Sequence, residues 1–176
     1  MPELRPGMQH LFLRDEDLRL GIELLFYAYR DFTAEPDRML AEIGLGRAHH
    51  RVVYFVGRYP GIVVGDLLGI LRITKQSLSR VLGELIRKGY IVQKRGAVDR
   101  RQRRLELTET GAALERTLTE NQRKRIAAAY RIAGAGAVDG FRRVMTQLID
   151  ERDRPKVAES PASAPPPRAS TGARRA

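Results

Sequence analysis

The chain has 176 residues, of which 43% are hydrophobic, so its length allows one domain with a sizeable core. It contains no cysteine, which excludes disulfides and thiolate metal sites and fits a reducing compartment. The net charge of +11 predicts a polyanionic partner. No apolar run is long enough to cross a bilayer and no leader pattern is visible, so we expect a cytoplasmic protein without a membrane partner.

The N-terminal part of the chain predicts an arm followed by two helices. Residues 1–14 combine prolines with apolar residues and are expected to form a docking arm. Three acidic residues at 15–17 suit the positive end of a helix dipole, and the apolar spacing predicts a helix over 15–42. Pro36 interrupts this pattern, which leaves either a kink or a separate final turn. A second helix is predicted over 47–59.

Residues 64–87 predict two short helices joined by a turn. Apolar residues recur at helical spacing on one face of each helix. The hydroxyl of Thr74 is placed to cap the second helix, and Gly89 is placed to end it. Val63 has no capping atom, so the first of the two helices begins weakly. Two helices joined in this way form a helix-turn-helix.

After Gly89 the sequence pattern becomes typical of β-strands, and after Leu107 it becomes helical again. A strand is predicted from Tyr90, a charged loop follows over 93–104, and an alternating returning strand ends at Leu107, which together make a hairpin wing. Thr108 is a suitable cap for a long helix, which a Gly-Ala-Gly break separates from a final helix ending at about residue 151. We therefore expect a mainly α protein with a small β-hairpin wing. Its tail, residues 152–176, is rich in proline and alanine, basic, and expected to be disordered.

Positive charge is concentrated on the helix-turn-helix and wing. From Arg72 to Arg104 the chain carries eleven lysines and arginines against two acids, whereas residues 1–71 carry eight bases and ten acids. Duplex DNA carries about one negative charge per 1.7 Å of its axis, and a concentrated basic surface gains affinity by releasing counterions. The charge distribution therefore favours a DNA-binding module.

Two strings in this region carry a family resemblance. They are YPGIVVGDLLGILRITKQSLSRVLGELIRKGYIVQKR and DRRQRRLELTETGAALE. They resemble the MarR family of bacterial transcription regulators, in which a wing ending in Asp-x-Arg runs into a strand and then into Leu-Thr-x-x-Gly. The corresponding residues here are Asp99, Arg101, Leu107, Thr108 and Gly111. The likeness is detailed over residues 45–118, although Val63 replaces the serine or threonine common in the family.

This resemblance implies an obligate homodimer that binds a pseudo-palindromic operator. The N- and C-terminal helices, residues 15–42 and 108–151, would interlock between two subunits. Residues 43–107 would form the winged helix-turn-helix lobe of each subunit. The expected function is therefore regulation of transcription through double-stranded DNA.

The second helix of the motif is expected to enter the major groove, which admits a helix and displays distinguishable base edges. Gln76 fits an adenine edge, and Arg80 fits guanine or a phosphate. The alternative interpretation is an ordinary solvated polar face. The candidate DNA-binding residues of this helix are Thr74, Lys75, Gln76, Ser77, Ser79 and Arg80.

In the wing, Arg101 is the candidate for the minor groove, where readout depends mainly on groove width and A·T content. Asp99 cannot approach phosphate and is expected to orient a neighbouring arginine. The alternative is an exposed ion pair of little consequence. Phosphate contacts or solubilising charges are assigned to Lys94, Arg95, Arg100, Arg103 and Arg104.

The family resemblance also implies a small aromatic or anionic effector between the dimerisation helices and the DNA-binding lobe. The candidate pocket residues are Tyr27, His49, His50 and Tyr54, with core packing as the favoured alternative. Adjacent histidines on a helix point about 100° apart, so they do not form the i, i+4 pair that would share one metal ion. We expect neither a metal nor a cofactor.

Two other classes of function are alternatives to DNA binding. The sequence offers no arrangement for acid/base, nucleophilic or nucleotide chemistry, and the Gly-Ala-Gly break follows no strand, so an enzyme is not expected. An RNA-binding or protein-binding winged helix is the remaining alternative. Single-strand binders rely on stacking aromatics, and Tyr90 is the only aromatic residue between Lys75 and Arg104, which favours duplex DNA.

Overall fold

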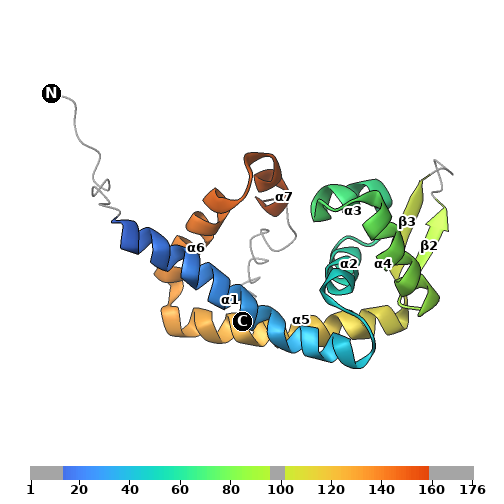
Figure 1. The fold of residues 1–176 in the computed structure, drawn as a ribbon, viewed down its shortest axis with the longest axis horizontal. Helices are drawn as coiled ribbons and strands as arrows, with labels where there is room; N and C mark the ends of the chain where they lie inside the picture. Colours follow the sequence, from blue (N-terminus) through green and yellow to red (C-terminus); the bar gives the residue numbers. More distant parts are fainter. Residues whose placement is uncertain (1–13, 96–101, 159–176) are drawn as a thin grey trace, which may run out of the picture. The chain divides into compact units, whose positions relative to one another are not determined.

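The computed structural model describes residues 14–95 and 102–158, which form a mainly helical chain with one small antiparallel sheet (Figure 1). The predicted fold class is confirmed. The chain divides into two compact units between Ile126 and Ala127. Helix α5 (Glu109–Ala133) therefore begins in the first unit and ends in the second. The elements are α1 (Asp15–Glu42), α2 (Arg47–Arg58), β1 (Ile62–Val63), α3 (Val64–Leu71), α4 (Lys75–Arg87), β2 (Ile91–Arg95), β3 (Arg103–Leu107), α5 (Glu109–Ala133), α6 (Ala135–Leu148), η1 (Glu151–Asp153) and α7 (Arg154–Ala158).

Helix α1 is continuous over 28 residues, with Pro36 inside it. Pro36 neither ends the helix nor starts a separate turn, because its buried ring is held in the packed C-terminal part of α1, where Leu40 is also fully buried. At the other end, Asp17 accepts a hydrogen bond from the backbone N–H of Arg14, and the acidic first turn offsets the helix dipole. The guanidinium of Arg125 on α5 donates to the carbonyl of Asp31, which ties α1 to α5 within the first unit.

The core of the first unit forms around α2, which packs against α3, α4 and β3 (Figure 1). The apolar stripes expected from the sequence supply this core. Its fully buried aliphatic side chains are Leu40, Val52, Val53, Val56, Leu67, Leu78, Leu85, Ile91, Leu105 and Leu118. Because both helices of the helix-turn-helix contribute to this core, their orientation is fixed and their polar faces remain outside.

The sheet has three strands in the order β1-β3-β2, and all pairs are antiparallel. The predicted two-stranded hairpin is therefore incomplete: Ile62 and Val63 add a third strand opposite Leu105 and Arg104. Two residues are too few to show an alternating pattern in the sequence. The wing strands are also longer than expected, since β2 continues to Arg95 and the predicted loop began at residue 93.

A tight junction joins the wing to α5. Thr108 donates its backbone N–H to the carbonyl of Tyr90 at 3.0 Å and its hydroxyl to the carbonyl of Gly89 at 2.6 Å. The same hydroxyl oxygen accepts the N–H of Gly111 at 3.0 Å, as an N-cap should. A Cβ atom at Gly111 would lie 1.9 Å from the carbonyl oxygen of Tyr90. This close approach explains why the residue three positions after Thr108 is a glycine.

The second unit contains the end of α5, then α6, η1 and α7, and the predicted break falls at Gly134. The expectation of disorder from residue 152 is wrong for residues 152–158, which are helical. The reason is local: Arg154 donates to the carbonyls of Ile149 and Gln147, and Pro155 lies in the first turn, where its missing N–H costs nothing. Within the described ranges, no helix is both long and apolar enough to span a membrane.

Candidate nucleic-acid interface

Helix α4 begins at a well-formed cap. The side-chain oxygen of Thr74 accepts the backbone N–H of Ser77 at 3.1 Å, as the sequence predicted. The hydroxyl of Thr74 also donates to the hydroxyl of Ser77 at 2.9 Å. Both side chains were candidates for base contact, and both are used in stabilising the first turn of the helix.

The outer face of α4 carries the other four candidates from this helix. Leu78, Val81, Leu82 and Leu85 are buried on the inner face, so the opposite side of the helix faces solvent. A surface hollow of about 660 Å³ lies on that outer face. It is lined by Lys75, Gln76, Ser79 and Arg80. The structure therefore gathers amide, hydroxyl and cationic groups at one exposed surface, as base and phosphate recognition requires.

Two contacts that the sequence did not reveal hold the back of α4. His49 accepts the N–H of Gly46 at Nδ1, so its Nε2 carries the proton and donates to Glu84 of α4 at 3.1 Å. This hydrogen bond lowers the pKa of Glu84 below its ordinary value. Lys88 donates to the carbonyl of Ile43 at 2.8 Å. The start of α2 and the loop before it therefore help to set the orientation of α4.

Like charges face each other across the two strands of the wing. Lys94 lies directly opposite Arg104, and Arg95 lies directly opposite Arg103. All four side chains are exposed, and among the described residues only Lys94 has an acidic partner, Glu106. Like charges directly opposite on a sheet are destabilising, so the pairing is unfavourable for the isolated protein and suits a bound polyanion.

Three candidate wing residues, Asp99, Arg100 and Arg101, lie outside the described residues. Their assignments as DNA contacts remain predictions. Strand β2 ends at Arg95 and strand β3 begins at Arg103, so the three candidates belong to the connection between these strands.

The turn between α3 and α4 contains a residue with an unusual backbone conformation. Arg72 adopts the left-handed conformation, with φ of 50°, and is the only non-glycine residue with positive φ among those described. Such a conformation is unfavourable for a side chain with a Cβ. No local sequence signal distinguishes this position, because the preference for glycine here depends on the turn geometry.

The four predicted effector-pocket residues have different surroundings. Tyr27 is exposed on α1, where the guanidinium of Arg30 lies 4.8 Å from its ring centroid, and Tyr54 packs edge-on against Phe55. His50 is buried, and both ring nitrogens of His49 are hydrogen-bonded within the protein. Their role in effector binding remains a prediction.

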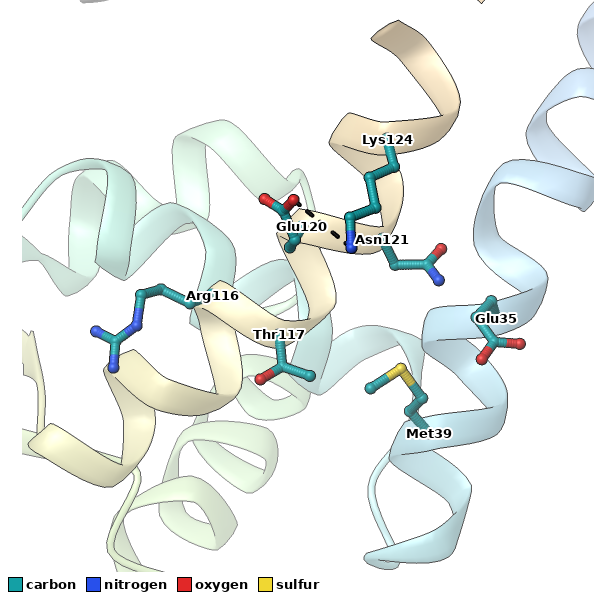
Figure 2. A pocket seen from close by; sticks show the side chains of 7 residues that line it. All are labelled: Glu35, Met39, Arg116, Thr117, Glu120, Asn121 and Lys124. Carbon is teal, nitrogen blue, oxygen red and sulfur yellow. Dashed lines mark ion pairs between the residues drawn. The ribbon is translucent and has the colours of Figure 1, made fainter. Parts of the chain in front are cut away.

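A different groove, with a volume of about 510 Å³, lies between α1 and α5 in the first unit (Figure 2). Figure 2 shows Glu35 and Met39 on α1 facing Thr117 and Asn121 on α5, whereas the side chain of Arg116 extends away from α1 and Lys124 is paired with Glu120. The α5 residues are Arg116, Thr117, Glu120, Asn121 and Lys124. In the sequence these are unremarkable exposed helix positions, so only the packing of α1 against α5 brings them together.

Burial of His50 predicts a pH-dependent stability. Burial disfavours the imidazolium and lowers the pKa of His50 below its ordinary value of 6.5, although Asp37 and Glu115 act in the opposite direction. In mildly acidic solution the unfolded chain therefore binds more protons than the folded one. The stability that depends on neutral His50 is fully present above the ordinary pKa and is lost as the pH falls below it, whereas the stability contributed by Glu84 is lost only at still lower pH.

We expect the thermal midpoint of the wild-type protein to decrease as the pH is lowered from about 7.5 to about 5.5. The midpoint of the His50→Gln variant should decrease less over the same range. Differential scanning calorimetry of both proteins across this range checks the expectation. An identical pH profile for the two proteins would contradict it.

The fold, the exposed polar face of α4 and the cationic wing define a winged helix-turn-helix regulator. A family model described as MarR family matches residues 43–102. The chain is 54% identical over 144 residues to the HTH-type transcriptional regulator PetP of Rhodobacter capsulatus, an alignment that covers 82% of this chain and 87% of PetP. The chain belongs to the MarR family, and it is a transcriptional regulator rather than an enzyme.

Solved structures share this fold at low sequence identity. FabT of Streptococcus pneumoniae, crystallised in complex with DNA, matches with a TM-score of 0.67 and 19% identity, covering 75% of this chain and 94% of FabT. NadR, crystallised in complex with 4-hydroxyphenylacetate, matches with a TM-score of 0.62 and 19% identity, covering 84% of this chain and 97% of NadR. The predicted winged-helix architecture is thereby confirmed, and the alignment with PetP confirms the predicted family.

Proposed function

We propose that the protein binds double-stranded operator DNA with sequence specificity, placing α4 in the major groove and the wing against the adjacent backbone and minor groove. The observation that carries this proposal is the pairing of cations across the wing, Lys94 with Arg104 and Arg95 with Arg103, beside the polar face of α4. FabT, of the same fold, was crystallised with DNA, which supports this choice over RNA or a protein partner.

The proposed assembly is a homodimer on a pseudo-palindromic site. Residues 18–29 of α1 include many large apolar side chains that are exposed in the single chain, as do residues 132–148 of the second unit. Large exposed apolar surfaces indicate an interface. A second copy would bury these surfaces and place two α4 helices about 34 Å apart, one turn of the duplex.

We further propose that a small aromatic or anionic effector controls operator binding. The groove between α1 and α5 has a volume within the usual range for ligand sites, and its lining includes Arg116, Glu35 and the ion pair of Lys124 with Glu120. NadR, of the same fold, was crystallised with an aromatic carboxylate. If aromatic carboxylates leave operator affinity unchanged, the protein is a constitutive DNA binder with respect to this class of molecule.

The Gln76→Ala variant tests the docking of α4. We expect specificity at one base pair of each half-site to relax by roughly 1–3 kcal/mol, because an amide pairs with an adenine edge through two hydrogen bonds. Fluorescence anisotropy with single-base variants of a duplex selected by the wild-type protein measures this change. Gln122→Ala, on α5 and outside the exposed apolar segments assigned to the dimer, is the matched control and should behave as wild type. Unchanged base preference in Gln76→Ala would contradict the proposed docking.

A further inference from the structure

Gly83 occupies an unusual place on the outer face of α4. This exposed face continues beyond the surface hollow from Arg80 through Gly83 to Arg87, each about one helical turn from the next. Two exposed arginines therefore lie on either side of a position that has no side chain. The result is a notch flanked by cations on the helix that is proposed to contact DNA.

The fold itself gives no reason for glycine at this position. Gly83 is within a regular helix, its φ is not positive, and nothing lies within 4 Å of where its Cβ would be. Glycine weakens a helix relative to alanine, so the isolated protein would be more stable with alanine here. Gly111 is the opposite case, because there the fold excludes any side chain.

The major groove offers an external reason. It is about 12 Å wide, and a helix with its side chains is about 10–12 Å across, so a helix in the groove has the phosphate backbone close on either side. A helix position without a side chain allows closer approach at that point, and flanking arginines supply charge for phosphates. The notch at Gly83 has both properties.

We propose that Gly83 is the position where the DNA backbone approaches α4 most closely, and that the missing side chain sets how deeply the helix enters the groove. This inference rests on the proposed DNA-binding function. Gly83 is then a positioning residue, because it allows Gln76 to reach the base edges without contacting a base itself.

The test compares Gly83→Ala with wild type and with Gly69→Ala. Gly69 is an exposed glycine of α3, also with open space around its Cβ, and lies outside the α4 face. Both variants should raise the thermal midpoint by a few degrees. For Gly83→Ala alone, affinity for a duplex selected by the wild-type protein should fall about tenfold, the order of one lost base contact. Affinity for a scrambled duplex of the same length should change little.

A double variant separates positioning from a simple local effect. If Gly83 controls the depth of α4, Gln76→Ala should change base preference much less in the Gly83→Ala background, because Gln76 no longer reaches its base. Selected-duplex binding equal to wild type in a folded Gly83→Ala protein, or an undiminished effect of Gln76→Ala, would overturn the inference. Failure of the wild-type protein to discriminate any duplex would instead refute the proposed function.

Discussion

Replacing Gly111 by alanine is expected to destabilise the protein by about 3 kcal/mol or more, at the upper end of the cost of overpacking. The added Cβ would lie 1.9 Å from the carbonyl oxygen of Tyr90 and 2.9 Å from its carbonyl carbon. These are backbone atoms, so relief requires α5 to move away from the wing. Such a movement would break the bonds of Thr108 to Tyr90 and Gly89. Urea denaturation followed by circular dichroism measures the loss of unfolding free energy.

Gly69→Ala is the matched control for this experiment, since the same methyl group is added to a helix where it meets nothing within 4 Å. It should be as stable as wild type or more so. A Gly111→Ala protein with wild-type stability would show that the junction between the wing and α5 is looser than the structure indicates.

The second large effect is expected from the exposed apolar part of α1. The double variant Ile22→Ser, Phe26→Ser removes two side chains that are 69% and 63% exposed in the single chain. If these surfaces are buried against a second copy, the variant should be monomeric at concentrations where wild type is dimeric. Because a monomer binds only one half-site at a time, operator affinity should fall by about 100-fold or more. Analytical ultracentrifugation and DNA binding measure the two consequences.

Ile43→Ser is the control, because Ile43 is also an exposed apolar residue but lies in the loop before α2, and its bond to Lys88 uses only the backbone carbonyl. It should remain dimeric. A double variant with the wild-type sedimentation coefficient and operator affinity would contradict the assigned dimer surface.

Local sequence patterns predicted the elements of this fold that depend on local interactions. The cap at Thr74, the end of α4 at Gly89 and the cap at Thr108 all depend on residues within a few positions, and all are confirmed. The helix-turn-helix was predicted for the same reason, because each apolar stripe lies within one helix.

The features that the sequence did not reveal depend on distant contacts. Strand β1 exists because Ile62 pairs with Leu105, and Pro36 is tolerated in α1 because its surroundings are buried. The bond of His49 to Glu84 joins residues 35 positions apart. Each requires the tertiary structure to be known first.

For the candidate site, the sequence predicted the polar face of α4 and the charged wing, but not the arrangement within them. The cap contacts of Thr74 and Ser77 and the pairing of Arg95 with Arg103 follow from backbone geometry and strand register. A count of charges does not contain this information.

The most direct test of the central claim is selection of duplexes from a random-sequence library by the full-length protein, followed by footprinting of the enriched sequence. The account predicts an inverted repeat whose half-site centres are one helical turn, about 34 Å, apart, with protection of both half-sites. Binding should weaken steeply with salt, because the wing and α4 release counterions from the duplex. Enrichment of no sequence, or equal binding to matched duplex RNA, would contradict it.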